Sequence, residues 1–328
     1  MITREQYRAA MSAYSRRMRR FKKRSKQYSR ILTVLLALFA AAFVIFILMR
    51  IFGKQDAGKI FAVMSILFAA AFTGIYALQY FYSEKITFMN DHIKPDKYII
   101  AASNAVLEAP FSPAAEKAVN NALAAETDSK RCAYLRALLF DHNCVTGDFD
   151  SAYRALFKDE ELFSTDKFAE LRYYANLVNY YVSCPSTTGS TEYAEEAYRN
   201  FERVYEEYSP SQNDFQAINY AMDVHIIMSY HRGDWQLCYD LSSLRLELFL
   251  RKSGESPVTE PALAVDKLMQ ADCLCHLGDY KEALRLCEEA LPSLESIKYQ
   301  ETKAKHLAEQ LRTYISMFNE EDEPTDDN

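Results

Sequence analysis

Two long apolar stretches near the N-terminus constrain this chain more than any other feature of its sequence. Residues 31–49 and residues 60–83 contain no Asp, Glu, Lys or Arg over 19 and 24 positions. A helix rises about 1.5 Å per residue, so about 20 residues cross about 30 Å of hydrocarbon. A buried core helix and a cleaved signal peptide are the alternatives, but the apolar part of a signal peptide has only about 7 to 15 residues. The sequence therefore predicts a transmembrane hairpin over residues 31–83.

The basic residues around this hairpin predict its orientation. Residues 1–30 hold 11 Lys and Arg, whereas the connection from Arg50 to Lys59 holds three. Basic segments are enriched on the cytoplasmic side of membranes. We therefore expect an integral protein of the cell membrane with two spans and with both the N-terminus and the C-terminus in the cytoplasm.

The two spans share a hexapeptide that bears on how they pack. Leu-Phe-Ala-Ala-Ala-Phe occurs at residues 38–43 and 67–72, so the copies are expected to meet at one depth of a hairpin. Small residues four positions apart let helix backbones approach closely in lipid. Such pairs are Ala37 with Ala41 and Ala70 with Gly74. They predict packing within the hairpin or, alternatively, a homodimer through the same faces.

The first 30 residues form a separate predicted segment, a basic amphipathic helix. Its apolar stripe follows helical spacing and comprises Tyr7, Met11, Tyr14, Met18, Phe21 and Tyr28. Beside a membrane span, such a helix is typical of one lying on the anionic inner leaflet. The residues expected to contact anionic lipid are Arg16, Arg17, Arg19, Arg20, Lys22, Lys23 and Arg24. A coiled-coil seam that dimerises the anchor and a contact with nucleic acid or an acidic partner are the alternatives, with nucleic acid the least favoured.

The rest of the chain predicts an all-α domain. The whole sequence has only 8 Gly and 9 Pro, too few for the many turns of a β-sandwich or barrel. Residues 83–328 carry a net charge of −19, against the basic N-terminus. Four glycines, Gly147, Gly189, Gly233 and Gly278, are spaced by 42, 44 and 45 residues. Regular spacing on this scale indicates a repeat.

Three of these glycines begin the same short motif. Gly is followed by Asp and an aromatic residue at 147–149, 233–235 and 278–280, and by Ala152, Cys238 or Ala283 three places after the aromatic. Gly allows the chain to leave one helix, and Asp can cap the next. The run from Leu277 to Pro292 resembles the tetratricopeptide repeat (TPR). The resemblance implies an α-solenoid of antiparallel helix pairs, although its usual period of 34 residues is shorter than the spacing here.

The resulting domain organisation has five parts. They are the basic segment 1–30, the hairpin 31–83, a linker 84–94, the TPR-like domain 95–318 and an acidic, disordered tail 319–328. Within the TPR-like domain we expect helices at 95–108, 113–126, 129–145, 149–163, 166–182, 191–208, 212–232, 235–252, 261–277, 280–291 and 294–318.

No motif for catalysis, a metal or a cofactor is found. Cys273 and Cys275 lie two positions apart on a predicted helix and so point about 200° apart, which does not suit zinc. His225 and His231 also fall on different faces of their helix. Phosphate-binding glycine loops and the common hydrolase motifs are absent.

Neither span carries an ionisable residue in its interior, which argues against transport. The seven Cys are expected to be reduced thiols. We therefore expect a protein that is not an enzyme and has no cofactor.

The TPR resemblance implies a binding function. In that family the first helix of each pair lines a groove that receives a peptide or a partner protein. Matched to this sequence, the residues expected to bind a partner are Tyr220, Asp223, Tyr230, Asp272 and His276. The expected function is a membrane-anchored scaffold or adaptor. The alternative is a regulatory sensor at the membrane that responds to a small molecule or a peptide.

Overall fold

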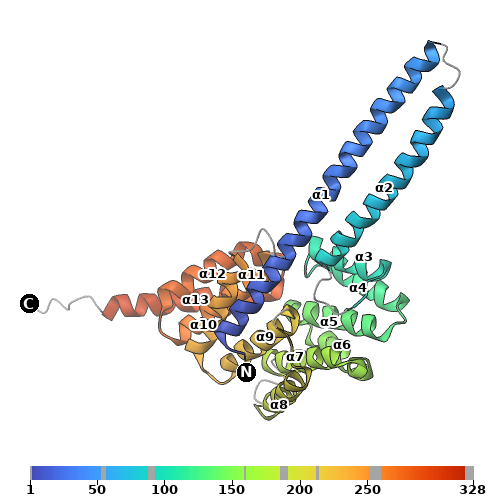
Figure 1. Cartoon of the computed structure of the whole chain (residues 1–328). Coiled ribbons are helices and arrows are strands. Elements are labelled where there is room, and N and C mark those ends of the chain that lie inside the picture. Colours follow the sequence, from blue (N-terminus) through green and yellow to red (C-terminus); the bar gives the residue numbers. More distant parts are fainter. Residues whose placement is uncertain are drawn as a thin grey trace, which may run out of the picture. The chain divides into compact units, whose positions relative to one another are not determined.

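The protein is all-helical in the part of the chain that the structure describes. The structure is a computed structural model, and it describes residues 2–52, 57–87, 93–158, 160–184, 191–211, 214–250 and 260–321. It contains 13 α-helices and one 3-10 helix within those ranges (Figure 1). The chain divides into two compact units: unit 1 comprises Met1–Ala13 and Asn90–Asn328, and unit 2 comprises Tyr14–Met89.

Unit 2 contains the two apolar stretches. Helix α1 (Arg4–Ile51) begins in unit 1 and continues without a break through both the basic segment and the first stretch, and α2 (Ala57–Thr87) contains the second. The domain boundary predicted at residue 30 lies inside α1. Both helices are long and apolar enough to cross a membrane, and almost none of their apolar windows is buried. Neither is therefore the core helix of a globular domain.

Aromatic side chains connect α1 and α2. Phe39 stacks on Phe68 at 4.3 Å and Phe46 stacks on Phe61 at 4.4 Å between ring centroids. Phe39 and Phe68 belong to the two hexapeptides, so the expectation that the copies meet is confirmed. The predicted packing of the small residues within the hairpin is wrong, whereas the homodimer through the same faces stays a prediction. Ala37, Ala41, Ala70 and Gly74 are all exposed, and no heavy atom lies within 4 Å of the Cβ position of Gly74. The contact between the two helices is made by the phenylalanine rings instead.

Near the start of its apolar stretch, α1 contacts α2 through Tyr82. The Tyr82 ring stacks on Tyr28 at 5.5 Å between centroids, and Nη1 of Arg24 donates a hydrogen bond to the Tyr82 hydroxyl at 2.8 Å. Tyr82 therefore packs inside the hairpin, whereas Tyr76 and Tyr80 of the same helix are exposed.

Unit 1 contains the helices of the predicted repeat domain. Their bounds are α3 Lys97–Glu108, α4 Pro113–Ala125, α5 Ser129–Thr146, α6 Phe149–Phe157, the 3-10 helix Glu160–Thr165, α7 Lys167–Ser183, α8 Thr191–Tyr208, α9 Phe215–His231, α10 Trp235–Leu250, α11 Glu260–His276, α12 Tyr280–Leu294 and α13 Lys298–Glu321. The expected helices are present with small changes at their ends. The helix expected at 149–163 is instead α6 followed by the 3-10 helix, and α12 continues through Pro292.

Three turns of unit 1 repeat one hydrogen-bonding pattern, as the Gly-Asp-aromatic motif predicts. The glycines Gly147, Gly233 and Gly278 have φ angles of 83°, 73° and 84°. The next residue donates its backbone N–H to the carbonyl five positions earlier, at 2.9 to 3.0 Å, which closes the preceding helix. The aspartate side chains of Asp148, Asp234 and Asp279 each accept a backbone N–H three residues later. The left-handed conformation explains why glycine recurs in these turns.

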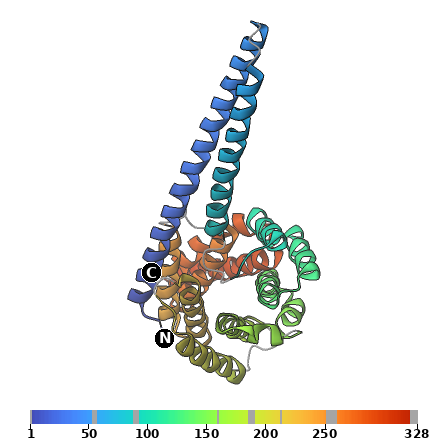
Figure 2. The ribbon, with the colours of Figure 1, turned by 45° about the vertical axis from the view of Figure 1, so that its right-hand side comes forward.

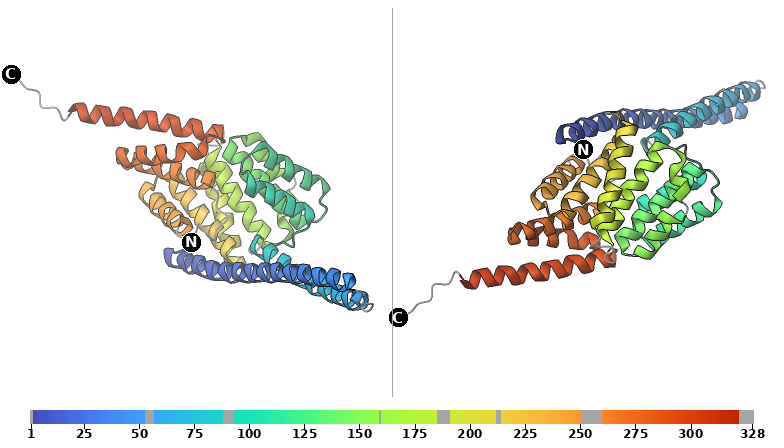
Figure 3. Two further views of the ribbon diagram at one scale, coloured as in Figure 1. Left: turned by 90° about the horizontal axis from the view of Figure 1, so that it is seen from above. Right: turned by 90° about the horizontal axis from the view of Figure 1, so that it is seen from below.

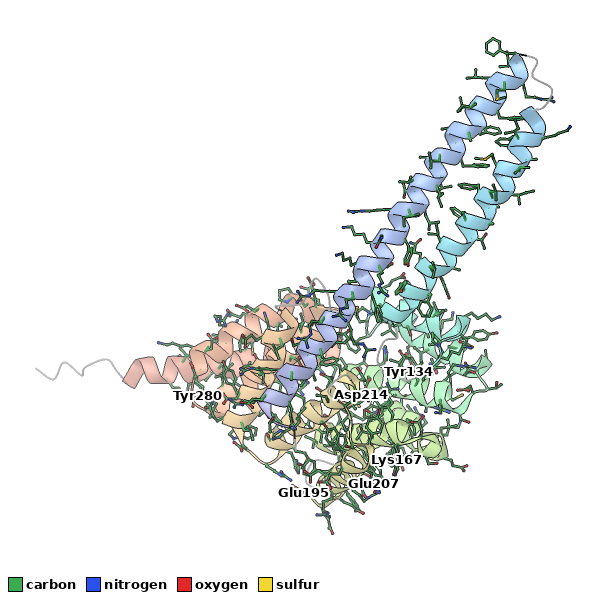
Figure 4. All side chains as sticks on the ribbon, in the orientation of Figure 1. Tyr134, Lys167, Glu195, Glu207, Asp214 and Tyr280 are labelled. Atoms are coloured by element: carbon green, nitrogen blue, oxygen red, sulfur yellow. The ribbon has the colours of Figure 1, made fainter. Side chains whose placement is uncertain are left out.

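The helices of unit 1 pack as neighbours along the chain. Contacts run from α3 to α13 mainly between consecutive helices, and α5, α7 and α9 also touch one another in turn (Figure 3). Charged pairs between helices reinforce this order. Lys167 of α7 binds Glu207 of α8 at 2.6 Å, and Arg232 after α9 binds Glu195 of α8 at 2.8 Å (Figure 4). The arrangement is repeat-like and compatible with a helical repeat protein.

One contact departs from the nearest-neighbour order of an open solenoid. Helix α13 returns to α5, as the curved row of unit 1 helices shows (Figure 2). Nε2 of Gln300 donates to the carbonyl of Val145 at 3.0 Å, and the Tyr299 ring meets Phe149 edge-on at 5.8 Å between centroids. The last helix thus packs against the first Gly-Asp-aromatic turn.

Several expected features lie outside the described residues. They are Gly189, residues 88–92 of the linker and residues 322–328 of the acidic tail.

Candidate functional site

The residues expected to bind a partner form two groups on α9 and α11. Tyr220 and Asp223 belong to the first group and make polar contacts with α7 and α10. Tyr230, Asp272 and His276 belong to the second, which gathers around the only tryptophan of the chain, Trp235. Each of the five side chains has a partner inside unit 1. Their role in partner binding stays a prediction.

Tyr220 belongs to a cage around a buried arginine. Arg172 of α7 is only 6% exposed, and its Nε donates to the Tyr220 hydroxyl at 2.6 Å. Its guanidinium carbon also lies 5.1 to 5.6 Å from the ring centroids of Tyr134, Phe168 and Tyr220. These distances suit cation–π attraction, which compensates for the loss of water around the guanidinium. Figure 4 labels Tyr134 at this position.

Asp223 belongs to a charged network that joins three helices. Arg245 of α10 donates to Asp223 of α9 and to Asp266 of α11, and its side chain is 11% exposed. Burial raises the pKa of Asp223 to about 6, although Arg245 lowers it and Asp266 raises it further. Burial alone would lower the pKa of Arg245, but the two carboxylates hold it above its ordinary value. The guanidinium therefore stays charged and binds both carboxyl groups.

The same network reaches the N-terminal segment of the chain. The Tyr7 hydroxyl lies 3.1 Å from Oδ1 of Asn219, and Nδ2 of Asn219 donates to Oδ2 of Asp223 at 3.0 Å. Tyr7 is fully buried, and its ring lies 6.3 Å from that of Phe215. The apolar stripe of the basic segment therefore begins as a packing face toward unit 1.

The second group is a layered aromatic platform at the ends of α9 and α11. The Trp235 ring stacks on the exposed His276 ring, with 3.9 Å between centroids and 6° between planes. Trp235 also meets Tyr230 edge-on at 5.1 Å between centroids. The Tyr230 hydroxyl donates to the Asp272 carboxylate, and burial followed by Asp272 itself raises the pKa of Tyr230. The hydrogen bond orients Tyr230, and Tyr230 supports Trp235.

The seven basic residues expected to bind lipid lie on α1 within unit 2. Arg16, Arg19, Arg20, Lys23 and Arg24 are exposed, whereas Arg17 and Lys22 are half-buried. Arg24 contacts Tyr82, as described above. The structure thus leaves cationic charge on the surface of this helix, and lipid binding by these residues stays a prediction.

The cysteine and histidine residues do not converge. Within the described ranges, no group of three or more His, Cys, Asp or Glu side chains is placed to hold a metal ion. Cys273 is buried beside Cys238 of α10, whereas Cys275 is half-buried. His225 lines a small cavity with Ile2, and Nε2 of His231 is buried without a hydrogen-bond partner in the described structure.

Four further residues of these two groups were not among the predicted site residues: Arg172, Arg245, Asp266 and Trp235. A signal exists for Trp235, because it is the aromatic residue of one Gly-Asp-aromatic turn. No local pattern distinguishes Arg172 or Arg245 from the arginines on exposed helix faces.

Comparison with known proteins identifies no family for this chain. No protein-family model matches the chain, and a search of curated proteins finds no match either.

Proposed function

We propose that the protein is a membrane-anchored scaffold whose TPR-like unit binds a segment of another protein. The observation that carries the proposal is the aromatic platform of Trp235, His276 and Tyr230 on a row of repeat-like helix pairs. Large aromatic side chains supported by a hydrogen bond are typical anchors of protein interfaces. A row of helix pairs supplies a rigid frame for them.

The anchor follows from the exposure of the apolar helices. Leu38, Ile45 and Ile66 are 61%, 57% and 69% exposed along the two stretches. Contiguous apolar surface of this extent is unfavourable in water and suits a lipid environment. We place both termini in the cytoplasm, because 11 basic residues precede the first span and three lie between the spans. The exposed cations of α1 would then lie near the anionic inner leaflet.

The topology is tested with reporter fusions to the full chain. A reporter active only outside the cytoplasm, such as alkaline phosphatase, is expected to be silent after Asn328 and active at Gln55, because only the short connection crosses. An active fusion after Asn328 together with a silent one at Gln55 would reverse the orientation.

The TPR assignment is supported by the three turns with one hydrogen-bonding pattern and by the alternation of helices along the row. The contact between α13 and α5 and the longer period make this unit a divergent form of such an array. The partner surface is the platform at the ends of α9 and α11.

The partner site is tested by capture from solubilised membranes. Trp235→Ala is expected to reduce co-purification of the bound protein about tenfold or more, because central aromatic anchors contribute about 2 kcal/mol or more to an interface. His276→Ala should reduce it less. His306→Ala, at an exposed histidine of α13, is the matched control and should leave capture unchanged. Equal capture by Trp235→Ala and the wild type, with equal thermal stability, would remove the platform from the interface.

One observation favours the sensor as a second candidate function. Helix α1 is continuous from the segment packed in unit 1 to the first apolar stretch. A ligand that changes the packing of Tyr7 would therefore act on the same helix that enters the membrane. A sensor should change its compactness when a ligand binds, whereas a passive scaffold should not.

A further inference from the structure

The N-terminal segment Ile2–Ala13 packs on unit 1 in the manner of a bound peptide. The contacting side chains follow helical spacing, with Arg4, Tyr7 and Met11 at steps of three and four. Tyr7 and Met11 are 0% and 1% exposed. A helix that inserts anchors at such spacing into a surface of other helices is a common mode of peptide recognition.

The receiving surface contacts Arg4, Tyr7 and Ile2 with groups that suit the chemistry of each side chain. Nη2 of Arg4 binds Oδ2 of Asp240 on α10 at 2.7 Å at the exposed rim. Tyr7 inserts its ring beside Phe215 and its hydroxyl against Asn219 on α9. Ile2 is 5% exposed and lines a small hollow formed with α8 and α9, including Tyr198, Phe201, Ala221 and Val224.

Asn219 connects this surface to the interior of unit 1. It accepts from Tyr7 and donates to Asp223, which in turn shares Arg245 with Asp266. The segment therefore completes a polar chain through α9, α10 and α11. Asn219 would lose a partly buried hydrogen bond if the segment left without a replacement, so the surface favours a phenolic hydroxyl at this position.

We infer that the surface on α8, α9 and α10 is a receptor for a short amphipathic helix, and that its occupant is this chain's own segment Ile2–Ala13. The recognition elements are an apolar residue, an arginine, a buried tyrosine and a methionine in the order of Ile2, Arg4, Tyr7 and Met11. The surface is distinct from the Trp235 platform and does not depend on the proposed partner. A second copy of the N-terminal segment has the chemistry to bind in its place when the first is released.

The test uses the full chain in an uncharged detergent and a fluorescent peptide of residues 1–20. The wild-type chain should bind the peptide weakly, because its surface is already filled. Tyr7→Ala in the chain should raise the apparent affinity about tenfold or more, since a site that is mostly occupied in cis presents only a small competent fraction. A peptide carrying Tyr7→Ala has the same charge and should not bind, which separates recognition from attraction between the basic peptide and the acidic unit.

Exchanging the charges of Arg4 and Asp240 gives a second test, and it leaves the buried ring of Tyr7 in place. Arg4→Glu in the chain should open the surface to the wild-type peptide. Asp240→Arg in the chain should weaken the binding of the wild-type peptide and strengthen the binding of a peptide that carries Arg4→Glu. Equal binding of the peptide to the wild-type, Tyr7→Ala and Arg4→Glu chains would overturn the inference. Equal binding to the wild-type and Asp240→Arg chains would also overturn it, because the peptide would then bind without using this surface.

Discussion

Replacing Arg245 with methionine is expected to destabilise unit 1 by about 3 to 5 kcal/mol, the usual cost of removing one partner from a buried ion pair. The change leaves Asp223 and Asp266 without the guanidinium that both of them bind. Their side chains are 29% and 17% exposed, so water replaces the lost contacts only in part. Thermal and denaturant unfolding of the full chain in detergent measure the loss.

Arg285→Met is the matched control for this variant. Arg285 of α12 binds Glu282 and Glu289 on its own helix, and its side chain is 52% exposed. Exposed ion pairs contribute little to stability, so this variant should unfold close to the wild type. A combined Arg245→Met, Asp223→Asn and Asp266→Asn variant should recover much of the loss, because no buried charge is left unpaired. If Arg245→Met and Arg285→Met unfold alike, the network is a surface feature and its assigned role is wrong.

Features that depend on a local pattern could be predicted from the sequence. The Gly-Asp-aromatic turns were predictable because a left-handed glycine and a capping aspartate act within six residues of each other. The apolar stretches were predictable because length and the absence of charge are sufficient to identify them. Most helix ends followed from the same local signals. The exceptions include α6, where nothing in the sequence marks the change to a 3-10 helix, and α12, which continues through Pro292.

Features that depend on distant contacts could not be predicted. Tyr7 and Asn219 lie 212 positions apart in the sequence, and no local pattern around either residue predicts their hydrogen bond. A stripe of Tyr7 and Met11 looks the same whether it faces lipid, another helix or the chain's own domain. The prediction that Ala37 and Gly74 pack within the hairpin was wrong for a related reason. Small residues permit close packing, but Phe39 and Phe68 occupy the interface and keep the backbones apart.

The contact between α13 and α5 provides the second large prediction. Gly147→Ala is expected to destabilise unit 1 by about 2 to 4 kcal/mol. Part of the cost is the positive φ of 83°, which is unfavourable by about 1 to 2 kcal/mol for a residue with a Cβ. The remainder arises because the new Cβ would lie 2.5 Å from Cγ of Tyr299 and must displace that ring from Phe149. An aromatic pair contributes about 0.5 to 1.5 kcal/mol, and the nearby hydrogen bond from Gln300 to Val145 contributes a similar amount.

Gly278→Ala separates these two causes. Gly278 has nearly the same φ, 84°, but no heavy atom lies within 4 Å of its Cβ position. Its alanine variant should therefore lose only the backbone part, and its melting temperature should stay several degrees above that of Gly147→Ala, at about 2 to 4 °C per kcal/mol for a domain of this size. In a Tyr299→Ala background the cost of Gly147→Ala should fall to that of Gly278→Ala, because the ring that obstructs the Cβ is gone. If the cost in that background is unchanged, α13 does not pack on this turn and the row of helices is open.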